Sequence, residues 1–331
     1  MKTKRLTVLT ESLPEYPTGL VASMKSVVRP LKYLLKREPL PVKRKYGGHY
    51  AVTRSLVEGL QKIGVDFNYN PANESELAEN VIVLSSPDTL RKAIQWKKAG
   101  KIKFLLAGPN ISDSVLDEDG LVGDPAIDYF IVPAAWIEVN VIKQLDVLRG
   151  KVQCWWAGVD TRYWSPQKAN KKRNVLVYWK TEGEEFCKQV EDMLVRHNFD
   201  PIRITYGKYH PSEFKSALES SLFAVFISRC ESQGIALTEA WAMDIPTLVW
   251  DPGELVIKGW VFEKVSACPY LTDETGKTWI TLKQLGELLE TFDQYQSQFR
   301  PRQHTVKLFS DEVCSQELLN FISSKSNIGK E

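Results

Sequence analysis

The sequence lacks the features that mark secreted and membrane-spanning proteins. Its five cysteines are odd in number, lie far apart and form no Cys-x-x-Cys pair, which favours buried thiols in a reducing compartment over a disulfide framework. The apolar stretch after the charged N-terminus ends at Thr10 and is too short for a signal peptide. No apolar run approaches the roughly 20 residues that a membrane span needs. We therefore expect a soluble, cytoplasmic protein.

Histidine and net charge are scarce as well. The four histidines lie far apart in the sequence and near no carboxylate cluster with ligand spacing, so we predict no metal site and no cofactor; they are His49, His197, His210 and His304. The 43 Lys and Arg residues nearly balance the 41 Asp and Glu residues, which leaves a formal charge of +2. This balance provides no overall attraction for nucleic acid, and we expect no nucleic-acid partner.

What is present is an alternating pattern over a length that suits two domains of roughly 150 residues. Short runs of Val, Ile, Leu and Phe recur between amphipathic stretches, as in strands that alternate with helices in a parallel sheet. A polar, basic stretch interrupts the pattern at 165–173. The expected strands are 6–9, 65–69, 80–84, 103–107, 129–132 and 152–156 before this stretch, and 175–178, 202–206, 222–227 and 247–250 after it.

The predicted fold is therefore α/β, with two Rossmann-like doubly wound domains that face a cleft. We assign 1–164 to the first domain, 165–173 to a linker and 174–331 to the second domain. Thr181 followed by Glu184 matches a capping box at a helix start. Expected helices are 52–63, 90–100, 182–197, 212–219, 234–243, 282–292 and 311–321. Doubly wound sheets bind ligands at the carboxyl ends of their strands, so we expect the site in the cleft.

The most informative segment runs from Ser228 to Pro246 and follows a strongly apolar strand. It carries Glu231 and Glu239 with seven residues between them. Gly234 and Ile235 would present free backbone amides at a helix N-terminus, where the helix dipole favours an anion such as a diphosphate. Glu239 lies more than one turn further along, where its carboxylate could accept hydrogen bonds from a ribose. These features together predict a site for a sugar nucleotide.

This segment resembles the Glu-x7-Glu signature of the retaining, family-four glycosyltransferases (glycosyl transferases group 1), which have the GT-B fold. Residues 157–166 look like the Asn-Gly-Val-Asp segment that ends the first domain in that family, and 268–276 carry a weaker likeness. Asp244 stands where the family usually has glycine. The resemblance implies a nucleotide-sugar donor held by the second domain, an acceptor on the side of the first, and transfer with retention and without a metal.

The resemblance also implies residue roles. Glu231 is expected to contact the hydroxyls of the donor sugar as the catalytic residue, and Glu239 is expected to hold the ribose. The amides of Gly234, Ile235 and Ala236 would bind phosphate or sugar. Lys180, which follows the first expected strand of the second domain, suits the donor diphosphate. The alternative is that Lys180 pairs with neighbouring carboxylates, which are Glu182, Glu184 and Glu185.

In the first domain the resemblance is thinner. Gly47 and Gly48 precede an expected helix, and family members often carry two glycines there that face the donor phosphates and the acceptor; a flexible loop is the alternative. His49 follows and could contact donor or acceptor, or be structural. Asn110 stands where many members have a His after a strand, and it could serve as the hydrogen-bonding group instead.

Several alternatives stay open. Residues 20–45 form a basic amphipathic segment that could lie on an anionic membrane, meet a phosphorylated acceptor or pack on its own domain. The function could also be that of a nucleotide-sugar epimerase, or of a non-catalytic sugar-nucleotide-binding protein that kept the fold. A Rossmann oxidoreductase is poorly supported because no Gly-x-Gly-x-x-Gly follows an early strand. The base, the sugar and the acceptor are not identified by the sequence.

Overall fold

The computed structural model describes residues 6–11, 47–167 and 173–326. The basic segment 20–45 lies outside the described residues. Contacts group the chain into two compact units, neither of which is continuous in sequence. The first unit comprises Met1–Val132, Val141–Trp155 and Ser315–Glu331, and the second comprises Pro133–Asn140 and Trp156–Cys314. Among the described helices, none combines the length and the apolar character needed to cross a membrane.

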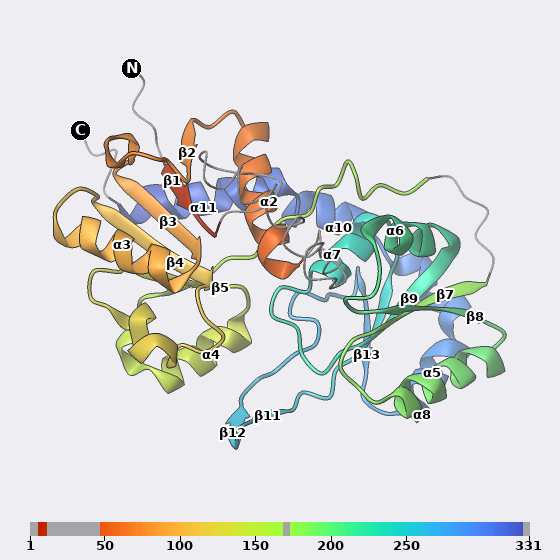
Figure 1. Cartoon of the computed structure of the whole chain (residues 1–331). Helices are drawn as coiled ribbons and strands as arrows, with labels where there is room; N and C mark the ends of the chain where they lie inside the picture. Colours follow the sequence, from red (N-terminus) through yellow and green to blue (C-terminus); the bar gives the residue numbers. More distant parts are fainter. Residues whose placement is uncertain (1–5, 12–46, 168–172, 327–331) are drawn as a thin grey trace, which may run out of the picture. The chain divides into compact units, whose positions relative to one another are not determined.

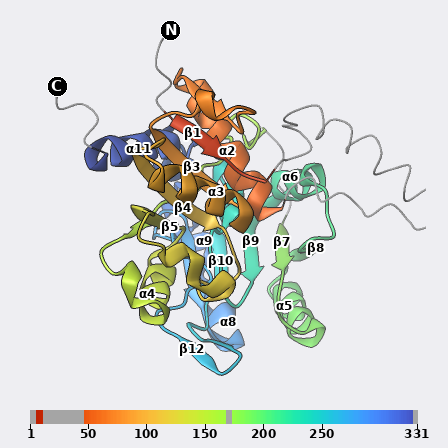
Figure 2. The same cartoon turned by 60° about the vertical axis from the view of Figure 1, so that its left-hand side comes forward.

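The first unit is built on a six-stranded sheet in the order β2-β1-β3-β4-β5-β6, and every pair of neighbours is parallel. Figure 2 shows β1, β3, β4 and β5 side by side in this order. The strands are apolar because both faces of a parallel sheet are covered, and β3 is buried along its whole length. Their bounds are β1 Leu6–Leu9, β2 Phe67–Tyr69, β3 Asn80–Ser85, β4 Phe104–Asn110, β5 Tyr129–Val132 and β6 Val152–Cys154.

Helices connect these strands. The helix α3 (Pro87–Lys98) packs on β3 and β4, and Ser86 caps it by accepting a hydrogen bond from the Thr89 amide at 3.3 Å. At the end of the chain, α11 (Asp311–Lys325) returns to the first unit, where Phe321 meets Tyr129 edge-on at 5.0 Å. The remaining helical elements are α2 Gly48–Lys62, η1 Glu74–Glu76, η2 Asp117–Gly123, α4 Ala135–Gln144 and η3 Asp146–Leu148.

The second unit is built on a five-stranded parallel sheet in the order β13-β10-β9-β7-β8. Side chains alternate along each strand, so Leu176 and Tyr178 of β7 join one apolar cluster and Val175 and Val177 join another. Figure 1 shows α6 and α7 above this sheet and α5 and α8 below it. The strands are β7 Asn174–Trp179, β8 Asp200–Thr205, β9 Ser221–Ile227, β10 Thr247–Trp250 and β13 Gly276–Trp279.

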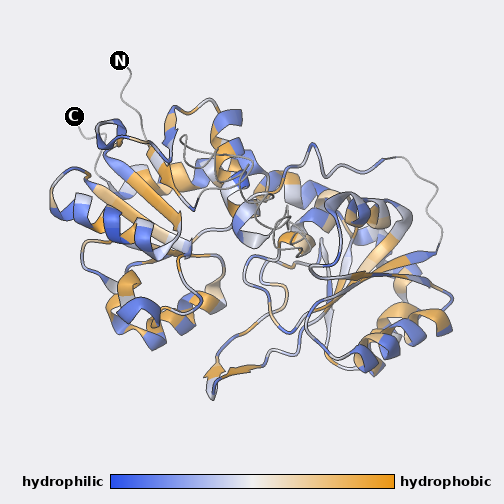
Figure 3. Ribbon diagram, in the orientation of Figure 1, coloured by the Kyte–Doolittle hydropathy of each residue, from blue (hydrophilic) through white to orange (hydrophobic). Residues whose placement is uncertain are grey.

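In the second unit, α5 and α8 are amphipathic, whereas α7 is apolar and mostly buried. Figure 3 shows apolar colour on strands of the sheet between them. A small antiparallel hairpin follows β10 and is formed by β11 (Leu255–Ile257) and β12 (Trp260–Phe262). The helices are α5 Glu184–Arg196, α6 Pro211–Ser220, α7 Ile235–Ala242, α8 Leu282–Glu290, α9 Phe292–Tyr295, η4 Gln296–Gln298 and α10 Pro301–Leu308. The predicted α/β class with two doubly wound parallel sheets is thus confirmed.

The predicted capping box at Thr181 and Glu184 is wrong. Helix α5 begins at Glu184 itself, its N-cap is Gly183, and no side chain caps it. The hydroxyl of Thr181 accepts a hydrogen bond from the Arg229 amide at 3.0 Å instead. Thr181 therefore links two loops of the sheet edge and is not available to start the helix.

The contact units depart from the predicted boundary at residue 164. Val159 and Trp164 are buried in the core of the second unit, although both precede the expected linker. Gly158 permits this packing, because a Cβ at that position would lie 2.6 Å from the Asp311 Cα. The Val159 amide then donates to the Phe309 carbonyl at 2.8 Å. The segment that resembles the family's domain junction is thus fastened to the second unit.

Candidate functional site

The second sheet has a topological switch point between β7 and β9. From β7 the chain moves to β8 on one side and then returns to β9 on the other. In open α/β sheets such a reversal leaves a crevice at the carboxyl ends of the two strands. Lys180 follows β7 directly, and the loop 228–234 follows β9 and leads into α7. The residues of the second unit that the sequence predicted to bind the sugar donor therefore lie at this edge of the sheet or in the helix that begins there.

The side chains of Lys180 and Glu231 meet at the switch point. The Lys180 Nζ lies 2.8 Å from each carboxylate oxygen of Glu231. The two side chains are only 21% and 13% exposed, respectively, so water screens the pair less than it would a surface pair. The same Nζ lies 4.8 Å from the ring centroid of Tyr206, an exposed residue just after β8. A cation, a carboxylate and an aromatic ring are thus gathered at one sheet edge.

The alternative pairing of Lys180 with its neighbours in sequence is not observed. Glu182 pairs with Arg229, and Glu184 pairs with Arg203 at 2.7 Å. Lys180 is instead paired with a residue 51 positions away.

The backbone of Glu231 is fixed from both sides. Its amide donates to the Ser266 carbonyl at 3.0 Å, and its carbonyl accepts from the Trp136 Nε1 at 3.0 Å. Within the same loop, the Ser228 hydroxyl donates to the Cys230 carbonyl at 2.9 Å. These bonds hold the loop in one conformation and aim the carboxylate at Lys180.

Helix α7 begins beside this loop. Gly234 is its N-cap and has φ +57°, a left-handed conformation that favours glycine. Ile235 and Ala236 lie in the first turn, where an amide has no acceptor four residues earlier within the helix. Such amides, together with the positive end of the helix dipole, favour the binding of an anion. Both expected elements of an anion site, the amides and Lys180, therefore lie on the loops of the same strand pair.

Glu239 lies near the same loops, within electrostatic reach of two tyrosines. The hydroxyls of Tyr178 and Tyr209 are 3.4 Å apart. Burial raises the pKa of Tyr178 well above its ordinary value, and the nearby Tyr209, Glu231 and Glu239 raise it further. Burial and then Glu239 likewise raise the pKa of Tyr209. Both phenols are thus neutral at pH 7. Glu231 and Glu239 both interact electrostatically with Tyr178, so the two predicted site carboxylates lie near the same tyrosine.

Sequence reasoning missed Arg229 and Trp136. The Arg229 guanidinium forms two hydrogen bonds to the Glu182 carboxylate, at 3.0 and 2.9 Å, and lies 5.1 Å from the Trp250 ring. These contacts tie the loop after β7 to the loop after β9. The only signal in the sequence was the position of Arg229 two residues before Glu231. Trp136 gave none, because it bonds a residue 95 positions away.

In the first unit, the switch point lies between β1 and β3. Thr10 follows β1, and Ser85 is the last residue of β3. Their hydroxyl oxygens are 2.6 Å apart, and the Glu11 amide donates a hydrogen bond to the Ser85 hydroxyl at 2.9 Å. Asn110 ends β4 in register with Ser85, and its Nδ2 is buried without a hydrogen-bond partner among the described residues. No motif had indicated Thr10 or Ser85.

The glycine pair lies at the start of α2, earlier than the expected helix start near residue 52. Gly47 is the N-cap, Gly48 is the first helical residue, and His49 is exposed in the first turn. Contacts of Gly47, Gly48, His49 and Asn110 with donor or acceptor stay predictions.

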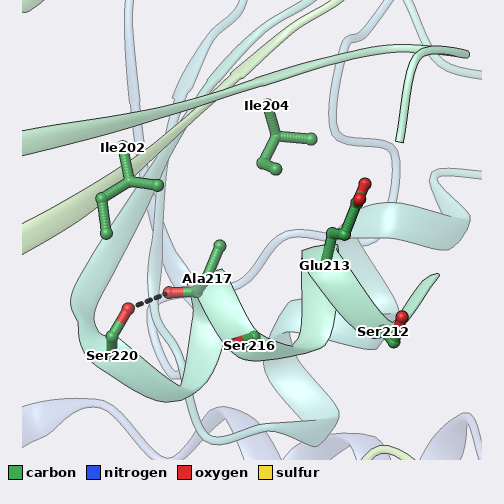
Figure 4. Close-up of a pocket in the computed structure, with 7 residues that line it drawn as sticks. All are labelled: Ile202, Ile204, Ser212, Glu213, Ser216, Ala217 and Ser220. Atoms are coloured by element: carbon green, nitrogen blue, oxygen red, sulfur yellow. Dashed lines mark hydrogen bonds between the residues drawn. The ribbon is translucent and has the colours of Figure 1, made fainter. Parts of the chain in front are cut away.

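An open pocket of about 480 Å³ lies between the edge strand β8 and α6. Figure 4 shows Ile202, Ile204 and Ala217 with the serines of α6 and Glu213. None of the sequence-predicted site residues lines it. Within residues 6–11, 47–167 and 173–326, no group of three or more His, Cys, Asp or Glu side chains is arranged to hold a metal ion.

No family model matches the sequence, and no curated protein sequence matches it significantly. Solved structures do resemble it. AviGT4, a glycosyltransferase involved in avilamycin A biosynthesis, is 10% identical with a TM-score of 0.56, over 98% of this chain and 99% of that one. The lipopolysaccharide outer core galactosyltransferase WaaB is 12% identical with a TM-score of 0.54, over 97% and 99%.

Sucrose-phosphate synthase from Thermosynechococcus elongatus is 11% identical with a TM-score of 0.53, over 97% of this chain and 99% of that one. At these identities the likeness concerns the fold. It shows that the chain has the two Rossmann-like domains of GT-B glycosyltransferases, as the sequence predicted.

Proposed function

We propose that the protein is a glycosyltransferase that moves a sugar from a nucleotide-diphosphate-sugar donor to an acceptor, with retention and without a metal. One observation carries the proposal: Lys180 and Glu231 meet at the switch point of the second sheet, beside the first turn of α7. A cation and free helix amides suit the diphosphate, and a carboxylate suits sugar hydroxyls. The fold shared with solved glycosyltransferases supports the same conclusion.

Donor binding would exchange the partners of Lys180. Both carboxylate oxygens of Glu231 accept hydrogen bonds from the Lys180 ammonium. A diphosphate carries more negative charge and would compete for that ammonium, because Ile235 and Ala236 contribute amides to the same anion. The exchange would release the Glu231 carboxylate to accept hydrogen bonds from the donor sugar. Glu239, further along α7, would hold the ribose.

Catalysis in this proposal comes from orientation and from stabilising the leaving group. As the bond between the anomeric carbon and the phosphate oxygen breaks, negative charge grows on the diphosphate. Lys180 and the α7 amides would stabilise that charge in place. Glu231 would fix the sugar so that the acceptor oxygen bonds the anomeric carbon on the face that the diphosphate leaves, and the acceptor's hydroxyl proton would pass to the departing phosphate oxygen. The acceptor itself stays unassigned.

The test compares Glu231→Gln with the wild-type protein. The variant should lose sugar transfer by about 100-fold or more, in the range seen for the loss of one group that stabilises a transition state. It should also bind free nucleoside diphosphates more tightly, because Lys180 has lost its competing carboxylate. Thermal shifts with uridine, guanosine, adenosine and thymidine diphosphates and their sugars measure binding. Product analysis by proton NMR measures transfer and the anomeric configuration, each with and without EDTA.

Glu287→Gln is the matched control, because Glu287 is an exposed residue of α8 that pairs only with Lys283, at 3.6 Å, among the described ion pairs. It should leave binding and transfer unchanged. Full transfer by Glu231→Gln would remove the role assigned to this residue. If no nucleotide or sugar nucleotide stabilises the wild-type protein, the function itself is refuted.

A second candidate is a binding protein that holds the sugar nucleotide without transferring the sugar. The double contact between Glu231 and Lys180 favours it, because both carboxylate oxygens of Glu231 are already hydrogen-bonded to the ammonium. Donor binding without transfer or hydrolysis would select this function.

Contact of residues 20–45 with an anionic membrane is a separate proposal. A cytoplasmic location is part of both proposed functions.

A further inference from the structure

The hairpin of β11 and β12 exposes apolar side chains on both of its faces. All six strand residues are apolar, with pairs Leu255↔Phe262, Val256↔Val261 and Ile257↔Trp260. Figure 1 shows the hairpin projecting from the second unit, and Figure 3 shows its strands in the apolar colour. Hairpins in water normally carry polar residues on the face that no core covers. This hairpin has no polar face.

The exposure of these side chains is large. Val256 and Val261, which share one face, are 62% and 64% exposed. On the other face, Ile257 is 47% exposed beside Trp260. An exposed apolar cluster of this kind marks a surface that is covered by something else in use.

The base of the hairpin is held firmly. The Asn140 side chain donates to the Glu263 carbonyl at 2.8 Å and accepts from the Glu263 amide at 2.9 Å. The ring of Phe262 meets Trp136 edge-on at 6.3 Å, and both pack with the buried Val265. The hairpin is therefore a fixed projection whose tip alone is exposed.

We propose that the tip of this hairpin, residues 256–261, inserts into the interfacial region of an anionic phospholipid bilayer. A bilayer surrounds a projection and covers both apolar faces, whereas a docked protein surface would cover one. The half-exposed Trp260 belongs to a residue type that is enriched at the boundary between headgroups and acyl chains. Because the outer strand edges keep unpaired backbone groups, insertion stops at the hydrated interface.

Charge is arranged to fit the same partner. The exposed Lys258 occupies the turn and forms no ion pair with any described residue, so it is available to lipid phosphates. The exposed carboxylates of Glu254 and Glu263 lie at the base, away from the tip. A second copy of the chain fits less well as the partner. A stable interface buries roughly 800 Å² per partner, with about 20–30 residues a side, and the hairpin tip has only six residues.

The hairpin follows β10 and so leaves the same carboxyl edge of the sheet as the Lys180–Glu231 pair. Trp136 touches both, since it bonds the Glu231 carbonyl and contacts Phe262. The inference about the bilayer does not depend on the proposed function.

The test uses the full chain and sedimentation with vesicles of phosphatidylcholine and phosphatidylglycerol. The hairpin variant combines Val256→Ser, Ile257→Ser and Val261→Ser. The matched control combines Val195→Ser, Ile280→Ser and Val306→Ser, which removes apolar side chains of similar exposure elsewhere in the second unit, 57%, 55% and 42%. Thermal unfolding by circular dichroism shows that both variants fold. Work in about 1 M salt shortens the screening length to about 3 Å and suppresses purely electrostatic binding by other basic segments.

The vesicle partition coefficient of the hairpin variant should fall at least tenfold, about 1.4 kcal/mol, while the control stays within twofold of the wild-type protein. Equal binding by the hairpin variant, or no binding by the wild-type protein, would overturn the proposal. A dimer in analytical ultracentrifugation that only the hairpin variant loses would also overturn it and identify a second copy as the partner. The hairpin substitutions should leave the thermal shifts with nucleotides unchanged. The bilayer proposal and the proposed function can therefore fail separately.

Discussion

At the scale of single residues, Asp244 shows how a departure from a family pattern keeps the same backbone. Its φ is +59°, a left-handed conformation that glycine adopts most easily and that Asp tolerates better than most other residues. Its carboxylate accepts a hydrogen bond from the Arg302 amide at 3.2 Å. Glycine, usual at this position in the family that the sequence resembles, would supply the same turn. The geometry after α7 thus explains the substitution.

Arg229 gives a prediction at the same scale, because it joins the two loops that carry Lys180 and Glu231. Arg229→Lys keeps the charge but removes the planar guanidinium, whose Nε and Nη2 form two parallel hydrogen bonds to Glu182. We expect the affinity for nucleoside diphosphates to fall about tenfold, because the loops shift by a few tenths of an ångström. Stability should change by less than about 1 kcal/mol, as for other partly exposed ion pairs. Calorimetric titration and urea unfolding measure the two effects.

Arg149→Lys is the control, because Arg149 also forms two hydrogen bonds to a carboxylate, that of Asp146, at 3.0 and 2.7 Å, and lies in the first unit. It should leave nucleotide affinity unchanged. A tenfold loss in this control, or none in Arg229→Lys, would contradict the positioning role.

The candidate site was predictable where a residue type and a strand end coincide in the sequence. Glu231, Gly234 and Lys180 follow strongly apolar strands, and chain direction alone places them at one sheet edge. Arg229 and Trp136 could not be assigned, because their roles depend on partners 47 and 95 positions away. Local sequence does not encode such distant pairings.

At the scale of elements, strand prediction succeeded where burial is complete and failed at the edge. Strands β1, β5 and β10 match their expected bounds, because both faces of each are covered and the residues are almost all apolar. Strand β13 was missed because Gly276, Lys277 and Thr278 have little apolar surface. Its position is set by parallel pairing with β10, which starts at Thr247↔Gly276.

Gly276→Ala tests this pairing. A Cβ at Gly276 would lie 2.0 Å from the Thr247 carbonyl oxygen, which is backbone and cannot rotate away. We expect a loss of about 2–3 kcal/mol in the free energy of unfolding, as for other overpacked sites. Urea unfolding followed by tryptophan fluorescence measures it.

Gly286→Ala provides the comparison for that experiment. Its added Cβ would meet the Met193 Sδ at 3.5 Å, an ordinary contact, within helix α8. The exchange should stabilise the protein by up to about 1 kcal/mol, because glycine is a poor helix former. Equal effects of the two substitutions would mean that the β10–β13 contact is looser than described.

At the scale of the whole molecule, the units are defined by buried side chains and not by the polar stretch that suggested a linker. The chain passes between units after Val132, Asn140, Trp155 and Cys314. Composition marks 165–173 as polar, but it does not reveal which core receives an apolar residue before that stretch. The predicted boundary therefore separates residue 164 from the core in which it is buried.

Trp164→Ala tests this grouping. The ring is 5% exposed and meets Phe214 edge-on at 5.8 Å, and the residue's carbonyl accepts from Arg302 at 3.0 Å. Removing a buried tryptophan side chain costs about 3–5 kcal/mol. The loss should appear as faster amide hydrogen exchange in β7, β9 and β10, while β3 and β4 keep their protection.

The matched variant is Leu106→Ala, which removes a fully buried side chain of β4 in the first unit. It should produce the opposite pattern, with faster exchange in β3 and β4 and unchanged protection in β9. Each result follows from which core loses contacts, because sites that share no partners affect stability independently. If Trp164→Ala instead exposes β3 and β4, residue 164 belongs with the first unit in solution and the linear boundary at 164 holds.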